Sequence, residues 1–171
     1  MHIPVLLFLW YKNQEDMVDF LVIGPINAAT YSCLFEFIKD RKMVLGYSSV
    51  SDFDNNNKSV VCRWFSSIRE DFPPELLLKE YKEGEYSKFD HFDAINIDRV
   101  EDIPDYEGVM GVPVSFIDYW NPDQFELVYA SDYIDDELFT NKSCMLLNCN
   151  GGEAAAVEGK KKFCRILIKR K

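Results

Sequence analysis

Short apolar runs and polar turns alternate along the first third of the chain. The run from Phe20 to Gly24 is continuous and ends at Pro25, which predicts an interior strand of a parallel sheet. Residues 30–41 then show the spacing of an amphipathic helix, with Thr30 as the expected N-cap. The predicted stripe of this helix consists of Leu34, Phe37, Ile38 and Arg41. A strand followed by a helix is therefore expected over residues 20–41.

Two more strands are expected after this helix. Residues 43–49 and 59–66 are largely apolar, and the segment 52–58 between them is rich in Asn and Asp, which favour turns. Strands joined by a polar loop without a helix are typical of an antiparallel hairpin. The pattern from residue 20 to residue 68 is thus strand, helix, strand, strand.

The pattern becomes irregular after residue 72. Short apolar or alternating runs predict strands at residues 94–97, 125–129 and 163–171. Between the first two of these runs the chain is interrupted repeatedly, by Pro104, Gly108, Gly111 and Pro113. No long element is expected there, and the Gly108 to Gly111 segment is interpreted as a turn pair. Residues 121–123, Asn-Pro-Asp, are also predicted to form a turn. This half of the chain is expected to be mixed, rich in strands and loops.

The charge of the chain is negative and unevenly distributed. Residues 160–171 contain seven Lys and Arg and no acidic residue, so the remaining 12 basic and 29 acidic residues give residues 1–159 a balance of −17. A surface that binds DNA alone usually carries a basic stripe. The acidic body therefore counts against stand-alone DNA binding and favours a solvated surface.

The cysteines and histidines give no sign of a metal site. Five Cys at irregular spacing and two distant His favour reduced thiols in a cytoplasmic protein and exclude a recognisable zinc motif. The apolar residues 3–10 are too few to span a bilayer and lack the flanks of a signal peptide, so no membrane contact is expected.

Several stretches, in order and spacing, resemble the C-terminal half of the EcoRI-type adenine-specific DNA methyltransferases. They are FDHFDAINI at residues 89–97, DIPDYEGVMGVPVSFI at 102–117, NPDQFELV at 121–128 and FCRILIKRK at 163–171. Residues 20–31, 43–47 and 61–68 look like the last strands of the family's catalytic sheet. The resemblance implies an α/β fold in which residues 1–70 end a Rossmann-like methyltransferase sheet and residues 71–171 form a C-terminal, DNA-contacting region.

The motifs that carry methyl transfer in that family are missing from this chain. Adenine methylation requires S-adenosylmethionine, an everted base, and acceptors for its amine, which the family supplies with an Asn-Pro-Pro-Phe tetrapeptide. Asn121-Pro122-Asp123 lacks the second Pro and the adjacent ring. No glycine-rich loop follows a strand and opens a helix. We therefore expect no catalytic residue, no cofactor-binding residue and no bound cofactor in the isolated chain.

The beginning of the chain does not resemble the family. Residues 1–14 fall outside the matching stretches, and the resemblance starts near residue 20. This pattern gives the expectation of a methyltransferase that lacks its N-terminal half, as a late start or a shifted reading frame would produce.

Candidate DNA contacts come from two places. Ligands of doubly wound sheets bind at the carboxyl ends of the strands, so Asn27 and Tyr31 are candidates, with a turn residue and a packing residue as the alternatives. The basic tail could neutralise phosphates, and its candidates are Lys160, Lys161, Lys162, Arg165 and Lys169. The alternative for the tail is a core strand with charged ends, in which Arg165 and Lys169 share one face and Ile166 and Ile168 point inward.

Aromatic residues offer a third kind of nucleic-acid contact. Tyr81, Tyr86, Phe89, His91 and Phe92 could stack bases, and the alternative is that they are core residues. The resemblance favours part of a DNA adenine methyltransferase of a restriction-modification system, inactive alone and acting on double-stranded DNA within an intact enzyme. Two alternatives remain open: an acidic protein-interaction module that binds a basic partner, and one chain of a split enzyme completed by a separate N-terminal chain.

Overall fold

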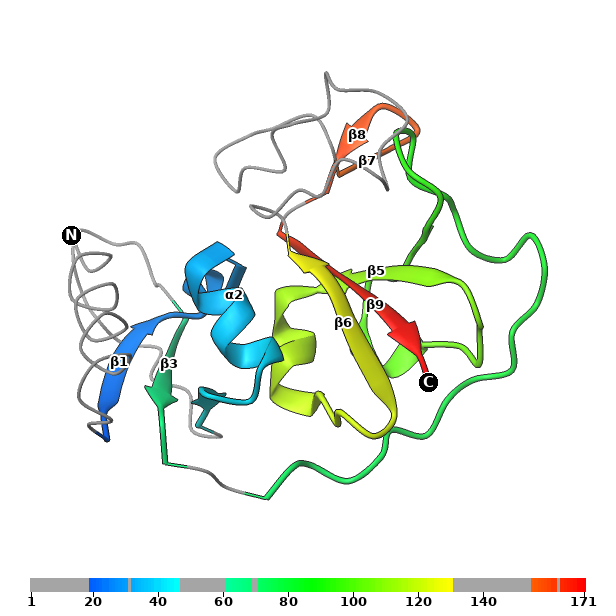
Figure 1. The fold of residues 1–171 in the computed structure, drawn as a ribbon. Helices are drawn as coiled ribbons and strands as arrows, with labels where there is room; N and C mark the ends of the chain where they lie inside the picture. Colours follow the sequence, from blue (N-terminus) through cyan, green and yellow to red (C-terminus); the bar gives the residue numbers. More distant parts are fainter. Residues whose placement is uncertain (1–18, 31, 47–60, 69–70, 131–154, 163) are drawn as a thin grey trace. The chain divides into compact units, whose positions relative to one another are not determined.

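The structure is a computed structural model that describes residues 19–30, 32–46, 61–68, 71–130, 155–162 and 164–171 (Figure 1). The fold is mixed α/β and divides into two compact units. Unit 1 comprises residues 1–29 and 33–71, and unit 2 comprises residues 30–32 and 72–171. Each unit has its own sheet, so each can be understood from its own residues.

The sheet of unit 1 has three strands among the described residues: β1 (Leu21–Pro25), β2 (Val44–Leu45) and β3 (Cys62–Ser66). Their order is β1-β3-β2, and β3 is antiparallel to both neighbours. The strands β1 and β2 therefore run parallel to each other with β3 between them. The predicted hairpin between the second and third strands is confirmed, because Leu45 pairs with Phe65.

The prediction of an interior parallel strand for residues 20–24 is wrong for the described residues. The paired neighbour of β1 is the antiparallel β3, from Leu21 opposite Ser66 to Pro25 opposite Cys62. Leu21 is 58% exposed, which an interior strand would not allow. A continuous apolar run indicates burial, but it contains no information about the direction of the neighbouring strand.

The predicted helix is shorter than its apolar spacing indicates. A 3-10 helix η1 (Ile26–Thr30) follows β1, and the α-helix α2 (Ser32–Lys39) follows it. Arg41 lies outside the helix with a φ of 60°, so its place on the predicted stripe is wrong. Its N–H donates to the carbonyl of Ile38 and the N–H of Lys42 to that of Phe37, which is a Schellman C-cap. The buried side chains of α2 are Leu34, Phe35, Phe37 and Ile38.

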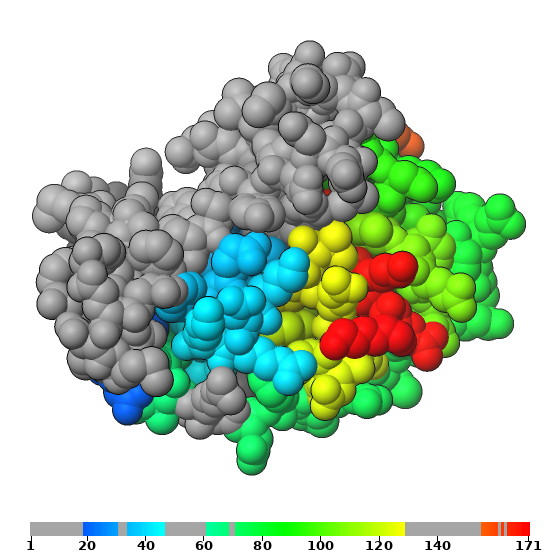
Figure 2. Space-filling view, in the orientation of Figure 1, coloured from blue at the N-terminus to red at the C-terminus, as the bar shows by residue number. Residues whose placement is uncertain are grey.

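The main sheet of unit 2 contains β4 (Ile95–Asn96), β5 (Val109–Pro113), β6 (Phe125–Ala130) and β9 (Arg165–Arg170). Their order is β4-β5-β9-β6, in which β4 and β5 are parallel and β9 is antiparallel to both β5 and β6. All three strands predicted after residue 72 are confirmed. The last of them, β9, lies in the middle of the sheet (Figure 1), and its end reaches the surface beside β6 (Figure 2).

The segment from Gly108 to Gly111 is not a pair of turns. Val109 to Pro113 form β5, and Met110 and Val112 are fully buried. Glycine and proline usually end a strand, but here Gly111 makes room for a ring and Pro113 is the last residue of β5. Two 3-10 helices, η2 (Val100–Asp102) and η3 (Val114–Tyr119), flank this strand.

The turn predicted at residues 121–123 is confirmed. The side-chain oxygen of Asn121 accepts a hydrogen bond from the N–H of Asp123, and the carbonyl of Asn121 accepts from Gln124 and Phe125. This Asx turn leads directly into β6.

A small hairpin precedes β9. It consists of β7 (Ala156–Val157) and β8 (Lys160–Lys161), with Glu158 and Gly159 between them at φ values of 52° and 71°. Two positive φ values in a two-residue loop are the mark of a type I′ turn.

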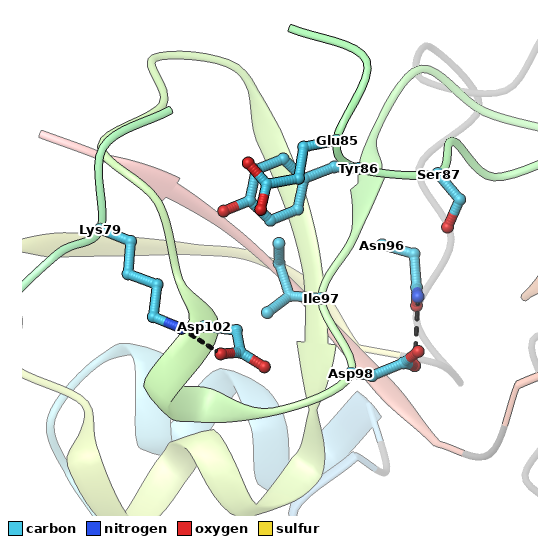
Figure 3. A pocket seen from close by; sticks show the side chains of 8 residues that line it. All are labelled: Lys79, Glu85, Tyr86, Ser87, Asn96, Ile97, Asp98 and Asp102. Atoms are coloured by element: carbon cyan, nitrogen blue, oxygen red, sulfur yellow. Dashed lines mark hydrogen bonds and ion pairs between the residues drawn. The ribbon is translucent and has the colours of Figure 1, made fainter. Parts of the chain in front are cut away.

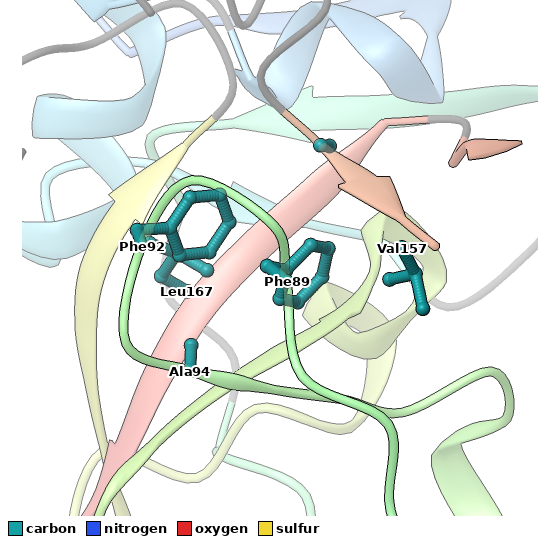
Figure 4. Close-up of a cluster of buried hydrophobic side chains, with 6 residues drawn as sticks. Phe89, Phe92, Ala94, Val157 and Leu167 are labelled. Carbon is teal, nitrogen blue, oxygen red and sulfur yellow. The ribbon is translucent and has the colours of Figure 1, made fainter. Parts of the chain in front are cut away.

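The rings of Phe89 and Phe92 gather over β9 (Figure 4). The buried cluster consists of Phe89, Phe92, Ala94, Ala155, Val157 and Leu167.

Cys164 lies immediately before β9 and is disulfide-bonded. The expectation of reduced thiols is wrong at this position, because an odd number of cysteines does not prevent one pair from forming. Cys62 is free and buried in β3.

Candidate functional site

A polar pocket of about 310 Å³ lies in unit 2 between β4 and the segment 79–87 (Figure 3). Two hydrogen bonds hold its walls: the N–H of Asn96 donates to the carbonyl of Ser87 over 2.7 Å, and the N–H of Lys79 donates to that of Ile103 over 3.0 Å. The lining residues are Lys79, Glu85, Tyr86, Ser87, Asn96, Ile97, Asp98 and Asp102. The pocket therefore combines one aromatic ring and one aliphatic side chain with charged and polar groups.

Three tyrosines form a ladder at one side of this pocket. The ring of Tyr81 stacks on Tyr86 with centroids 5.9 Å apart and an angle of 12°, and its distance to the ring of Tyr106 is 4.7 Å. All three are half-buried. Burial, with the nearby Glu85 carboxylate, raises the pKa of Tyr86. Its hydroxyl is therefore a proton donor and acceptor, not an anion, at neutral pH.

Lys79 and Asp102 form an ion pair at the other side. The Nζ of Lys79 lies 2.5 Å from the carboxylate of Asp102, and this hydrogen bond is the main cause that raises the pKa of Lys79. Both side chains are substantially exposed, so the pair contributes little to stability. The only lysine among the lining residues therefore already has a carboxylate partner.

Asp98 is the centre of a charged network beneath the pocket. It accepts from the amide nitrogen of Asn96 at 3.1 Å, from Lys162 at 3.0 and 3.1 Å, and from Arg165 at 2.9 Å. The hydrogen bond from Asn96, followed by that from Lys162, lowers the pKa of Asp98. The Nε of Arg165 also donates to the side-chain oxygen of Asn96 at 3.3 Å. Burial is the main cause that lowers the pKa of Arg165.

The structure brings together two of the seven predicted DNA contacts. Arg165 and Lys162 meet at Asp98, where Arg165 is buried and is part of the core of unit 2. Lys160, on the hairpin, and Lys169, opposite Glu126 on β6, are exposed. Asn27 is half-buried in η1. The side chain of Lys161 and the whole of Tyr31 lie outside the described residues.

Of the aromatic candidates for base stacking, Phe89 and Phe92 are core residues. His91 is exposed, and Tyr81 and Tyr86 belong to the ladder beside the pocket. Sequence reasoning missed the acceptors of the site. Asn96 lies on the strand predicted at residues 94–97 and Asp98 directly follows it; this spacing of two was the available signal, because alternate residues of an extended chain point to the same side.

Two further findings concern the described residues. They contain no helix long and apolar enough to cross a membrane. Within the same ranges no three His, Cys, Asp or Glu side chains converge as metal ligands would.

The chain is similar to Type II methyltransferases over nearly its whole length. It is 31% identical over 200 residues to the Type II methyltransferase M.EcoRI of Escherichia coli, covering 98% of this chain and 56% of the relative. It is 31% identical over 182 residues to M.MgeORF184P of Mycoplasma genitalium, covering 89% and 57%. M.MpnI of Mycoplasma pneumoniae is 29% identical over 187 residues, covering 92% and 58%. The chain thus spans about half the length of the curated relatives it matches. No solved structure matches it.

These relatives place the chain in the class of Type II methyltransferases. The family model of the adenine-specific methyltransferase EcoRI matches residues 48–171, and the chain belongs to this family. The resemblance found in the sequence is confirmed. The interpretation of residues 1–14 as foreign to the family is wrong, because the match to M.EcoRI leaves only 2% of this chain uncovered.

The turn after β1 does not have the form of a glycine-rich cradle for the methyl donor S-adenosylmethionine. In unit 1 the turn after β1 is Ile26 to Thr30, which contains no glycine, and the side chains of Ala28 and Ala29 fill the space behind it at 1% and 0% exposure. A binding loop for the donor would need a turn whose backbone can come close to the ligand, which glycine allows. No step of methyl transfer can therefore be derived from the described residues.

Proposed function

We propose that this chain forms the C-terminal part of an S-adenosylmethionine-dependent DNA adenine N6-methyltransferase of a restriction-modification system. The observation that carries the proposal is the family match over residues 48–171, which includes all strands of the unit 2 sheet. The relatives are named as Type II methyltransferases. In this role the chain acts on double-stranded DNA in the cytoplasm as part of an intact enzyme.

Unit 1 would supply the end of the Rossmann-like catalytic sheet. The arrangement of β1, α2, β2 and β3 supports this part of the proposal. It is a strand-helix unit followed by a hairpin, with β3 returning between two parallel strands. Unit 2 would supply the DNA-contacting region, with the exposed Lys160 and Lys169 as phosphate contacts.

The chain alone should not transfer a methyl group. Its sequence has neither the Asn-Pro-Pro-Phe tetrapeptide nor a glycine-rich loop after a strand. Without the acceptors that hold the target amine, the base cannot be oriented for attack on the donor.

The direct test is incubation of the purified chain with DNA and S-adenosylmethionine labelled in its methyl group. We expect no labelled adenine. A chimaera in which this chain replaces the corresponding part of M.EcoRI should label adenine. Labelling by the chain alone would overturn the proposed inactivity. A folded chimaera that binds the donor but labels no DNA would contradict the proposed enzyme.

One observation favours a split enzyme as a second candidate. Among the described residues β1 pairs along one edge only, and its first residue, Leu21, is 58% exposed. An open edge with apolar neighbours is the usual place for a further strand to pair. A separate N-terminal chain that carries the missing motifs would be that partner. A monodisperse monomer at high concentration that fails to bind such a chain would exclude this candidate.

A further inference from the structure

We propose that the corner formed by residues 119–125 is a recognition site for an extended, proline-containing peptide, and that residues 72–76 of this chain occupy it. The inference goes beyond the proposed function, because it concerns unit 2 alone and holds whether or not the chain takes part in methyl transfer. It stands on the way the corner holds this segment, on the hydrogen bonds that hold the corner itself, and on the exposure of the segment's side chains.

Side chains of the corner hold the main chain of the segment. Residues 72–78 form no helix or strand and lie as an open coil (Figure 1). Gln124 pairs with both backbone groups of Leu76: its Nε2 donates to the carbonyl and its Oε1 accepts from the N–H, each over 2.7 Å. The Nδ2 of Asn121 donates to the carbonyl of Pro73 over 2.9 Å. A side-chain amide that bonds both groups of one residue takes the place of a neighbouring strand, so it recognises extended main chain.

An aromatic contact adds a second element of recognition. The ring of Phe72 meets that of Trp120 edge to face, with centroids 6.1 Å apart and an angle of 69°. Trp120 is 7% exposed and its Nε1 donates to the carbonyl of Phe125 over 3.0 Å, which fixes its ring independently of Phe72. Pro73 and Pro74 follow Phe72 and restrict the backbone to extended conformations, so little chain entropy is lost on docking.

The corner is braced by hydrogen bonds that do not involve the segment. Its Asx turn is closed within residues 121–125. The carbonyl of Gln124 also accepts from the N–H of Lys171, and the Nζ of Lys171 donates to the carbonyl of Pro122 over 2.6 Å. The hydrogen bonds of Pro73 and Leu76, by contrast, all go to the corner. The corner is therefore the preformed receptor, and the segment is the ligand that depends on it.

The exposure of the segment's side chains defines what the site reads. Leu77 is 97% exposed and Glu75 is exposed, so neither side chain is recognised. The partner that fits is an extended peptide with an aromatic residue directly before Pro-Pro and free choice at the positions of Glu75 and Leu77. Because the chain's own segment is tethered beside the site, a peptide from another protein has to displace it.

Replacement of residues 72–76 by Gly-Ser-Gly-Ser-Gly empties the site and permits the first test. A synthetic peptide of residues 71–78 is titrated into this variant, and the NMR signal of the Trp120 indole N–H reports binding. We expect a saturable shift with a dissociation constant of about 1 mM or tighter, and binding to the native chain at least about tenfold weaker, because its own segment competes. No saturable shift, or equal binding to the native chain, would overturn the inference.

Substitutions in the peptide and in the corner test the specificity. A peptide with Phe72→Ala should bind at least about fivefold more weakly, because it loses the aromatic contact. A peptide with Leu77→Ala is the matched control and should bind as well as the parent. Gln124→Ala in the emptied variant should also weaken binding at least about fivefold. Equal effects of the two peptide changes, or undiminished binding after Gln124→Ala, would overturn the inference.

Hydrogen exchange in the full native chain gives a test that does not depend on the emptied variant. The amide of Leu76 should exchange slowly, and Gln124→Ala should accelerate it at least about fivefold. Asn121→Asp keeps the side-chain oxygen of the Asx turn and loses the donor to Pro73, so it should also accelerate Leu76. The amide of Ile168 in β9 should be unaffected by both changes. An unprotected Leu76 in the native chain, or equal acceleration at Ile168, would overturn the inference, because the contacts would then be absent or would only support the fold.

Discussion

Gly111 in β5 faces the ring of Phe89 so closely that a Cβ atom at Gly111 would lie 2.3 Å from Cε2 of that ring. Phe89 cannot move away easily, because it is buried and stacks on Phe92 with centroids 4.5 Å apart. The close approach of strand and ring fixes the segment before β4 against the middle of the sheet. That segment contains Tyr86 and Ser87, so the packing at Gly111 also positions the pocket wall.

Gly111→Ala should destabilise the protein by about 1–3 kcal/mol through overpacking. Chemical denaturation measures this loss. A Phe89→Ala background supplies the control, since the ring that the new methyl group meets is then absent. The two substitutions should cost less together than the sum of their separate effects. Additive losses would show that the ring does not limit the space at residue 111.

Asp98→Ala should destabilise unit 2 by about 1–3 kcal/mol, because it removes hydrogen bonds between charged groups next to a buried guanidinium. The side chain of Arg165 is only 10% exposed in this pair. The matched control is Asp93→Ala, whose ion pair with Lys88 has exposures of 91% and 65%. That loss should stay below about 1 kcal/mol. Equal losses for the two variants, measured by denaturant unfolding, would contradict a structural role for Asp98.

The stabilisation from Asp98 should depend on pH. Hydrogen bonds from Asn96 and Lys162 lower the pKa of Asp98 in the folded protein. Its contribution is therefore present above the unfolded-state pKa and is lost as the pH falls through the lower, folded-state pKa. The stability difference between the native chain and Asp98→Asn should be constant from about pH 7 to 5 and shrink below about pH 4. A difference that already vanishes near neutral pH would point to another group.

Asp90 should hold the β7–β8 hairpin in place. Its carboxylate accepts hydrogen bonds from the N–H groups of Glu158 at 2.9 Å and Gly159 at 2.8 Å, and its own N–H donates to Ala156. In Asp90→Ala, hydrogen exchange at the amides of residues 158 and 159 should accelerate markedly, with a loss of about 1–2 kcal/mol in stability. Exchange in β6 should be unchanged and serves as the internal control. Protection that persists at both turn amides would exclude this role.

Lys160 and Lys162 should differ in their effect on DNA binding by the chimaeric enzyme. Lys160 is exposed, whereas the ammonium of Lys162 is held by both oxygens of Asp98. Lys160→Ala should reduce the slope of log affinity against log salt by about 1, as expected for one phosphate contact. Lys162→Ala should leave that slope nearly unchanged and reduce stability instead. The reverse result would mean that the network at Asp98 opens when DNA binds.

The sequence was informative where a pattern has one structural meaning. The alternation in residues 125–129 and the short apolar run in 163–171 predicted β6 and β9, because both patterns are typical of strands. Gly111 was misleading, since the glycine that breaks a strand and the glycine that admits a ring look the same without the partner ring. The network at Asp98 was also hidden, because Asn96 and Arg165 are 69 positions apart and only the sheet brings them together. The antiparallel direction of β3 relative to β1 could not be predicted for the same reason, because only the assembled sheet shows which strands pair.

The central position of β9 also determines when this part of the chain can fold. Among the described strands, β5 and β6 share no ladder with each other and each pairs with β9, which follows β6 after a long interval in the sequence. A nascent chain that has not yet exposed residue 165 therefore carries two strands with open hydrogen-bonding edges. Such a chain has to wait for its last strand, and its folding should be slow and dependent on protection during synthesis.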